Sequence, residues 1–278
     1  MNHIDYPPSL SELPPVLYKY RSFDEHGWRM LSELEIYFAS PKHFNDPLDT
    51  RIPVLYEQGT FKQMYAKNVE NLKWIASNMS RKERKRRAKE MAKTVYRNRE
   101  DPKRREAYRN ATVEEIDSMA GILSLAAIRD QTLMWSHYAD GHRGFCIGID
   151  SQKLLHFAER LSYVGIHLLV DKVRYYDEPP KLNPYKMTDA QVFMTKWFCK
   201  SQEWSYEQEY RVLCGERPDY ALQLAPDLLH SVTLGAKCQD ANRQRVIELI
   251  KSKRYSATLE EARFGETGRI QFKSVNRS

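Results

Sequence analysis

Cysteine is scarce in this chain and does not follow the spacing of a cross-linked or metal-bound framework. Four cysteines occur in 278 residues, all in the C-terminal half: Cys146, Cys199, Cys214 and Cys238. No two of them form a C-x-x-C pair, which argues against a zinc-binding framework and a disulfide scaffold alike. We therefore expect buried free thiols and a cytoplasmic protein.

Long apolar runs are absent as well. No stretch approaches the ~18 apolar residues that a membrane-spanning helix requires. Residues 1–8 lack the basic start and the apolar stretch of a secretory leader. The sequence therefore predicts no membrane span. A protein partner or an inhibitor is possible, but the sequence does not identify one.

The chain does contain enough apolar and aromatic residues for a folded core. Hydrophobic residues make up 41% of it, and they include 17 Tyr, 10 Phe and 5 Trp. This composition is typical of a globular protein rather than a disordered one. The length suffices for a substantial core, and we expect a single domain over residues 1–278.

Strand-like and helix-like patterns follow one another unevenly along the chain. Strands are predicted at residues 16–21, 34–39, 121–128, 145–149, 168–176, 206–213, 228–234 and 269–274. Helices are predicted at residues 22–33, 61–108, 112–117, 151–160, 190–199 and 242–253. Uneven alternation favours an α+β fold with mixed, mainly antiparallel sheets and a central cleft over a parallel, doubly wound sheet.

The net charge of +7 is concentrated in one part of the predicted helical section. Residues 80–110 contain 14 Lys and Arg against 5 Asp and Glu, so they carry +9 while the rest carries about −2. Residues 81–87 read Arg-Lys-Glu-Arg-Lys-Arg-Arg and are polar around the whole helix. We expect a basic helical insertion at about residues 61–110. It is either a solvated helix or a phosphate-binding surface formed by Arg84, Lys85, Arg86 and Arg87.

Short polar and aromatic motifs recur in a characteristic order outside this section. They lie at residues 18–21, 40–47, 134–138, 144–148 and 204–211, with Ser124 and Asp130 between the second and the third. Together they closely resemble the bacterial domain-of-unknown-function family 2971, from about residue 16 to residue 240. The stretch at about 61–110 is the part least like the family pattern.

The order of the polar residues also resembles, more faintly, that of ADP-ribosyltransferases. Those folds bind NAD in a cleft between two small sheets. They carry an Arg or His on the first strand, a Ser or Tyr on a middle strand and a Glu on a late strand. Here Arg21, then Ser124 or Tyr138, then Glu207 or Glu209 occur in that order. The Ser-Thr-Ser strand of that pattern is missing.

The chemistry of these residues suits such a reaction. In a strand, Glu207 and Glu209 would share one face, because side chains repeat every second residue. One carboxylate would stabilise an oxocarbenium ion and the other would activate the acceptor, and the choice between them is open. Arg21 would clamp a pyrophosphate, and aromatic rings would stack on nicotinamide. The predicted catalytic residues are Glu209, Glu207 and His137, and the predicted NAD-binding residues are Arg21, Tyr20, Asn45, Asp46, Ser124, Trp135, Tyr138 and Arg211.

Each assignment has a structural alternative. Asn45 and Asp46 before Pro47 are typical of an Asx-turn. Arg211 is equally suited to pair with Asp46 or Glu209, and the two glutamates could lie at a solvated edge. Trp135 and Met134 suit a hydrophobic core, and His137 suits a structural role as well as a catalytic one.

Three classes of function remain. The first is an NAD-using, ADP-ribosyltransferase-like enzyme that modifies nucleic acid or protein, in a toxin or phage-defence setting suggested by analogy alone. The second is a metal-dependent nuclease or phosphodiesterase using Asp46, Asp130, His137, Glu207 and Glu209, although no recognised metal-ligand spacing supports it. The third is a non-catalytic nucleic-acid-binding module that works through the basic helix.

Overall fold

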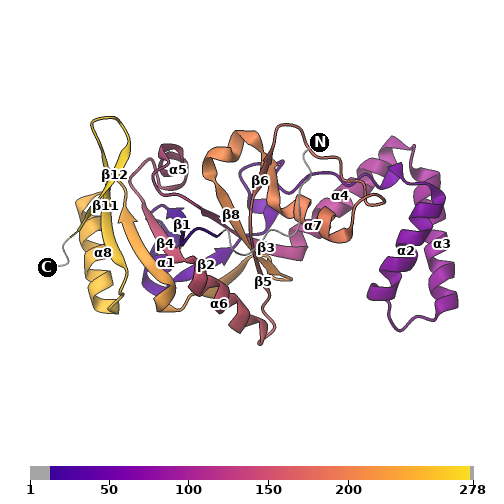
Figure 1. Ribbon diagram of the computed structural model, residues 1–278, viewed down its shortest axis with the longest axis horizontal. Coiled ribbons are helices and arrows are strands. Elements are labelled where there is room, and N and C mark those ends of the chain that lie inside the picture. The colour runs from indigo at the N-terminus through magenta and orange to yellow at the C-terminus, as the bar shows by residue number, and fades with distance from the viewer. Residues whose placement is uncertain (1–12, 276–278) are drawn as a thin grey trace. The chain divides into compact units, whose positions relative to one another are not determined.

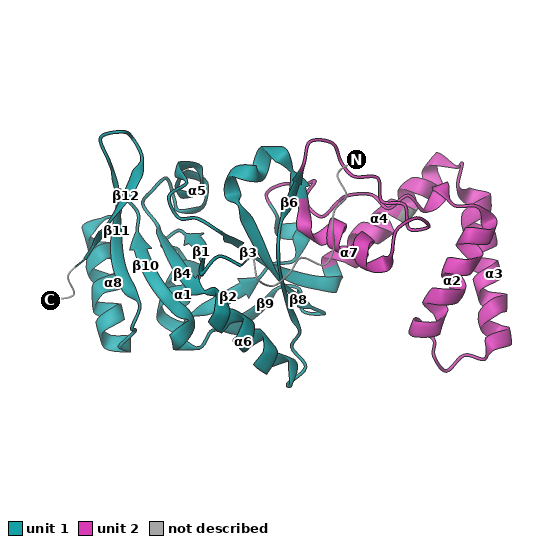
Figure 2. Cartoon of the chain, in the orientation of Figure 1, with its two compact units in different colours: residues 1–44, 118–175, 200–278 teal, residues 45–117, 176–199 magenta. Residues whose placement is uncertain are grey.

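The computed structural model describes residues 13–275, which form two compact units (Figure 2). Unit 1 comprises residues 1–44, 118–175 and 200–278, of which 13–275 are described here. Unit 2 comprises residues 45–117 and 176–199. The helical stretch predicted at about 61–110 therefore lies wholly in unit 2.

Unit 1 is built on an eight-stranded sheet with the strand order β12-β11-β10-β4-β1-β3-β8-β5 (Figure 1). Neighbouring strands are antiparallel, except that β10 and β11 are parallel. The strands are β1 (Val16–Arg21), β3 (Ala120–Ala126), β4 (Phe145–Asp150), β5 (Leu168–Lys172), β8 (Glu209–Gly215), β10 (Leu229–Leu234), β11 (Thr258–Phe264) and β12 (Ile270–Ser274). Two short pairs complete the strands: β2 (Glu35–Phe38) with β9 (Tyr220–Gln223), and β6 (Arg174–Tyr176) with β7 (Cys199–Ser201).

The large sheet has two parts, β12-β11-β10-β4-β1 and β3-β8-β5, and a single residue pair between β1 and β3 joins them. Strands β1 and β4 pair along their whole length, and so do β3 and β8. Between β1 and β3 the register contains a single residue pair, Tyr18 opposite Ala126. Residues beyond this pair, such as Lys19 and Arg21 on β1, therefore have no cross-strand partner on the β3 side. The polar residues of the candidate site lie around this junction.

Helices α1 (Glu25–Glu33), α5 (Thr132–Tyr138), α6 (Ser151–Ser162) and α8 (Asp240–Lys253) belong to unit 1. Asp24 caps α1 by accepting a hydrogen bond from the Gly27 amide at 2.7 Å, and Asp150 caps α6 through the Lys153 amide at 3.0 Å. Such caps satisfy amides that have no partner inside the helix. They begin these helices close to the residues that the sequence indicates.

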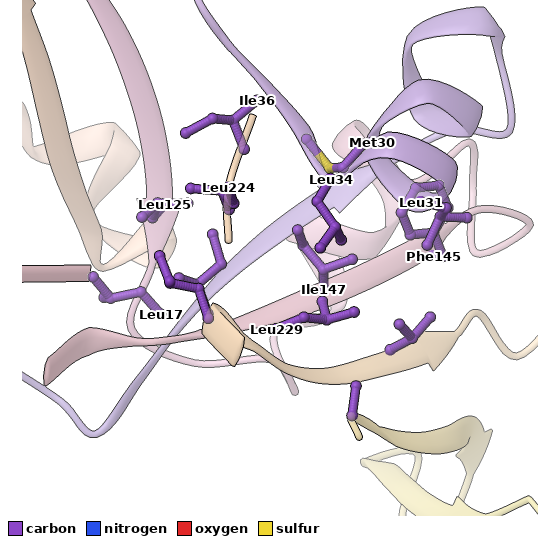
Figure 3. Close-up of a cluster of buried hydrophobic side chains, with 14 of the residues drawn as sticks. Leu17, Met30, Leu31, Leu34, Ile36, Leu125, Phe145, Ile147, Leu224 and Leu229 are labelled. Atoms are coloured by element: carbon purple, nitrogen blue, oxygen red, sulfur yellow. The ribbon is translucent and has the colours of Figure 1, made fainter. Parts of the chain in front are cut away.

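The main core of unit 1 gathers apolar residues from helix α1 and from both parts of the large sheet. Figure 3 shows Leu17 of β1, Leu31 of α1, Leu125 of β3 and Ile147 of β4 in one cluster, and each of the four is buried. Burying one such aliphatic side chain stabilises the fold by about 1.5–3 kcal/mol. The alternate residues of the strands, such as Tyr20 on β1 and Cys146 on β4, belong to a second buried cluster with Trp135.

Unit 2 is mainly helical: α2 (Phe61–Ile75), α3 (Arg81–Asn98), most of α4 (Pro102–Met119), and α7 (Asp189–Phe198). Thr60 forms a capping box with Gln63, Ser80 caps α3, and Pro102 occupies the first turn of α4, where its missing amide costs nothing. Helix α3 is not polar all round, because Ala88 and Ala92 are buried and α3 packs against α2.

The α+β class and the mainly antiparallel sheet are confirmed, but some predicted elements are wrong in detail. The segment 112–117 is the end of α4 rather than a separate helix, and the strand predicted at 206–213 begins only at Glu209. Strands β7, β9 and β11 carry no clear alternation in the sequence and were not predicted. The cysteines are free thiols, three buried and Cys238 half-buried. Within residues 13–275, no helix combines the length and apolar character of a membrane span.

Candidate functional site

Glu207 and Glu209 come together by a route other than strand alternation. Glu207 ends a short 3-10 helix (Gln202–Glu207), Gln208 adopts a left-handed backbone with φ 43°, and β8 begins at Glu209. Both glutamates are buried, with exposed fractions of 4% and 3%. The alternative of a solvated sheet edge is therefore wrong. Buried carboxylates need paired partners, since burial of a charge is costly otherwise.

Lys200 on β7 supplies the first partner and links the two glutamates. Its Nζ donates to Glu207 Oε2 at 2.6 Å and to Glu209 Oε2 at 3.5 Å. The ammonium is itself buried and lies 4.5 Å from the ring centroid of Trp204. One cation thus serves two carboxylates inside the protein.

Arg211 supplies the second partner. Its Nε donates to Glu209 Oε1 at 2.9 Å and its Nη2 to Glu209 Oε2 at 3.2 Å, which is a bidentate ion pair. Arg211 is fully buried, and Ser124, opposite Arg211 in the β3–β8 register, also hydrogen-bonds Glu209. The pairing of Arg211 with Glu209, which the sequence left as one alternative, is confirmed.

The two carboxyl groups have opposite pKa shifts. Burial alone would raise the pKa of Glu209, but the charges of Arg211 and Lys200 outweigh it and lower that pKa to about 2. Burial and the neighbouring Glu209 charge raise the pKa of Glu207, and Lys200 and Tyr138 offset only part of that rise. Glu209 is therefore the permanently ionised member, and Glu207 is the member suited to exchange a proton.

Helix α5 carries two of the predicted site residues, Tyr138 and His137, and only Tyr138 contacts the glutamate pair. The hydroxyl of Tyr138, a half-buried residue, donates to Glu207 Oε1 at 2.6 Å. His137 is exposed, its ring centroid lies 6.3 Å from that of Tyr206, and no hydrogen bond within residues 13–275 joins it to either glutamate. Tyr138 thus connects the buried pair to the surface, whereas His137 lies outside the hydrogen-bonded cluster.

Strand β1 contributes two cations near the sheet junction. Lys19 Nζ donates to the Ser124 carbonyl at 2.8 Å. Burial and the charge of Arg21 lower the pKa of Lys19 to about 7, although Glu209 and Glu207 act in the opposite direction. Burial also lowers the pKa of Arg21, and its Nε is a buried donor without a hydrogen-bond partner among the described residues.

Tyr20 and Trp135 are core residues. Their rings meet edge to face with centroids 5.2 Å apart, and both are buried. The Tyr20 hydroxyl donates to the Ile128 carbonyl at 3.0 Å, and Trp135 Nε1 donates to the Arg129 carbonyl at 2.7 Å. With their polar groups satisfied, these rings have no open face for a nicotinamide, and the core alternative for Trp135 is confirmed.

Asn45 and Asp46 belong to unit 2, whereas the glutamates belong to unit 1. Asp46 Oδ1 accepts a hydrogen bond from the Leu48 amide at 2.9 Å, which is the Asx-turn that the Asn-Asp-Pro sequence indicates. Asp130 is exposed. Among the described residues, no three His, Cys, Asp or Glu side chains form a group that could hold a metal ion.

Lys200 and Lys19 are the members of the cluster that the sequence did not identify as site residues. Lys200 lies two residues after the end of α7 and nine residues before Glu209, and it carries no motif of its own. Lys19 lies within the 18–21 motif, where Arg21 is the more conspicuous cation. A lysine spaced closely before two glutamates is the one available signal, and it is a weak one.

A comparison with protein families supports the resemblance suggested by the motifs. A family described as "Protein of unknown function (DUF2971)" matches residues 134–212. This span contains Tyr138, Lys200, Glu207, Glu209 and Arg211, so the hydrogen-bonded cluster lies largely inside it. No curated protein and no solved structure gives a significant match.

Proposed function

We propose that this chain, whose residues 134–212 match the DUF2971 family, is an ADP-ribosyltransferase-like enzyme that takes NAD as its substrate. The observation that carries the proposal is the buried Glu207–Glu209 pair, whose members have opposite pKa shifts. Two carboxylates with separate protonation behaviour are what acid–base chemistry at neutral pH requires.

The cations of β1 fit the anionic part of this substrate. Arg21 has a buried Nε that lacks a hydrogen-bond partner in the described part of the chain. Lys19 lies close enough to Arg21 that the charge of Arg21 adds to burial in lowering the pKa of Lys19. A guanidinium suits a diphosphate because it donates two parallel hydrogen bonds. Arg21 and Lys19 are thus the diphosphate-binding residues of the proposal, and Tyr138 is its half-buried aromatic residue.

The proposed reaction is a displacement at the ribose carbon that carries nicotinamide. The bond from that carbon to the nicotinamide ring nitrogen breaks, and nicotinamide leaves with the electron pair as a neutral molecule. An acceptor oxygen or nitrogen forms the new bond, and its proton passes to Glu207, directly or through Tyr138. Glu209 stays ionised and stabilises the positive charge that develops on the ribose.

Removal of the Arg21 guanidinium tests the substrate. Arg21→Ala is expected to weaken NAD binding at least tenfold, because a charge-assisted hydrogen bond is worth about 1.5–3 kcal/mol. Isothermal titration of NAD into wild type and variant measures the change. Arg143→Ala is the matched control, since Arg143 is an exposed arginine of the same unit whose partner is Asp140. Wild type that does not bind NAD at millimolar concentration, or equal binding by Arg21→Ala, would contradict the proposal.

A second candidate function rests on the exposed cations of α3. Lys85, Arg86 and Arg87 are exposed, whereas Arg84 is half-buried and its Nη2 donates to the Met79 carbonyl at 3.0 Å. Three of the four predicted phosphate-binding residues are therefore available to a ligand. We propose that this face binds nucleic acid through its phosphates, independently of the base sequence.

Charge reversal tests this surface. The triple variant Lys85→Glu, Arg86→Glu and Arg87→Glu is expected to lower affinity for a short RNA at least tenfold at 50 mM salt. Its log–log salt dependence should be shallower by about 0.7 for each lost phosphate contact with a single strand. Fluorescence anisotropy measures both. A triple variant in unit 1, Arg160→Glu with Lys251→Glu and Lys253→Glu, changes the net charge equally. Equal losses in the two variants would indicate a net-charge effect and not an α3 surface.

A further inference from the structure

Unit 2 contains a cavity of about 280 Å³ in which every ionisable lining residue is a cation. These cations are Arg51, Arg109 and Lys196. The remaining wall is mostly apolar and includes Ile52 and Ile116. The cavity belongs to unit 2 and the glutamate pair to unit 1, and none of the lining residues is assigned a role in the proposed transferase.

Lys196 on α7 is the most unusual member. Only 8% of the residue is exposed, and its Nζ has no hydrogen bond to any residue in the described part of the chain. Burial lowers the pKa of Lys196 to about 8; the charge of Glu115 opposes this shift and that of Arg51 adds to it. A buried lysine without a close acceptor costs stability, since an ammonium in low dielectric needs a counter-charge.

Arg51 carries a second unsatisfied donor. Its Nη2 donates to Asp117 Oδ1 at 2.6 Å, whereas its Nη1 makes no hydrogen bond to that carboxylate. Nη1 is buried and has no hydrogen-bond partner in residues 13–275. Buried donors are nearly always satisfied in folded proteins. This donor and the Lys196 ammonium line the same cavity, and together they indicate an acceptor that binds there.

We propose that this cavity binds a small organic phosphate monoester, with the phosphate among Arg51, Arg109 and Lys196 and the organic part against the apolar wall. A phosphate monoester carries two negative charges and three acceptor oxygens near neutral pH, which suits three cations better than a singly charged carboxylate does. The volume is close to the lower limit of ligand pockets, about 300 Å³, so the organic part is no larger than a ring or a short chain.

A neighbouring cavity supports an anionic ligand. It measures about 120 Å³ and shares Val54 and Arg109 with the first. Arg99, Arg104 and Arg105 contribute further positive charge there, against one negative charge from Glu57. Arg99 pairs with Glu100 and Arg104 with Asp101, so these residues are not all free to bind a ligand. Their positive potential nevertheless attracts an anion towards the shared residue Arg109.

Phenyl phosphate, inorganic phosphate and phenol are the probes for the full-length chain. At 5 mM, phenyl phosphate is expected to raise the melting temperature of wild type by several degrees, because a ligand that binds only the folded state stabilises it. Inorganic phosphate should have a smaller effect and phenol none. No shift with phenyl phosphate, or an equal shift with inorganic phosphate, would overturn the proposal.

Lys196→Met is the decisive variant. It removes the charge while keeping a long apolar side chain, and it should fold well because no buried ammonium remains. It is expected to lose at least nine-tenths of the affinity for phenyl phosphate, measured by isothermal titration. Lys73→Met removes one charge from an exposed position on α2 and should bind as wild type does. Equal affinity in wild type and Lys196→Met would place the ligand elsewhere.

Proton uptake provides a second, independent measurement. The charged groups near Lys196 are Arg51, Arg109, Glu115 and Asp117, of which Asp117 is paired with Arg51. At pH 8.5 Lys196 is mostly neutral in the free protein, and a bound dianion would protonate it. Titrations in two buffers of different ionisation enthalpy should show uptake of about 0.7 proton in wild type. They should show almost none in Lys196→Met, and equal uptake in both would overturn the proposal.

Discussion

Glu209→Ala is expected to lower the free energy of unfolding by about 3–5 kcal/mol, because it removes the carboxylate with which the buried Arg211 forms its bidentate ion pair, whereas Lys200 keeps Glu207. Arg211 is fully buried and donates two hydrogen bonds to this carboxylate. Urea denaturation followed by circular dichroism measures the change. Arg143→Ala is the control, since it breaks an exposed arginine–aspartate pair of similar length, 2.7 Å, and should change stability far less.

A double variant separates charge burial from misfolding. Glu209→Leu with Arg211→Met removes both charges and retains similar volume, so it should recover a large part of the stability that Glu209→Ala loses. Equal losses in Glu209→Ala and the Arg143→Ala control would mean that the buried network contributes nothing beyond a surface pair.

The pH dependence of this loss has a definite sign. The pKa of Glu209 is about 2 in the folded protein against an ordinary value of 4.5, so the unfolded chain binds the proton more readily. The contribution is therefore complete above about pH 4.5 and is lost as the pH falls towards 2. The stability difference between wild type and Glu209→Gln should accordingly shrink between pH 4.5 and pH 2.

Glu207→Gln is expected to lower NAD turnover by about 10²–10⁴-fold, the usual contribution of a general base. Gln keeps the shape of the side chain, and its single carbonyl oxygen can still accept from Lys200 while its amide group donates to the Tyr138 hydroxyl. Glu203→Gln is the matched control, because Glu203 lies on the same 3-10 helix and is exposed. Release of nicotinamide measures turnover, and far-UV circular dichroism checks that each variant is folded.

The pH profile distinguishes a base from a structural residue. Burial and the charge of Glu209 raise the pKa of Glu207, so turnover should rise with pH along a limb that lies above the ordinary carboxyl value of 4.5. That limb should disappear from the residual activity of Glu207→Gln. A folded Glu207→Gln variant with full turnover and an unchanged profile would exclude Glu207 as the base.

Much of the fold can be predicted because the local pattern is strong. The apolar run of β4 and the Asp24 and Asp150 caps each indicate an element almost independently of the rest. The absence of glycine from residues 61–108 indicates helix, and the structure divides this stretch into α2, α3 and the first part of α4. Prediction is poorer where tertiary contacts override local preference. Glu207 lies in a 3-10 helix instead of a strand, because a left-handed Gln208 turns the chain into β8.

In the candidate site, too, some features depend on the local sequence and others on tertiary contacts. The sequence by itself determined the α+β class, the basic helical segment and the residue types available for chemistry, since all of these depend on composition and on contacts between near neighbours in the chain. Only the tertiary structure decided which of these residues meet. Tyr138 reaches Glu207 across 69 positions, and Ser124 lies opposite Arg211 through the β3–β8 register. Such contacts depend on long-range packing, which no local pattern in the sequence specifies. The same packing buried Tyr20 and Trp135, joined Lys200 to both glutamates and left Lys196 inside a cationic cavity.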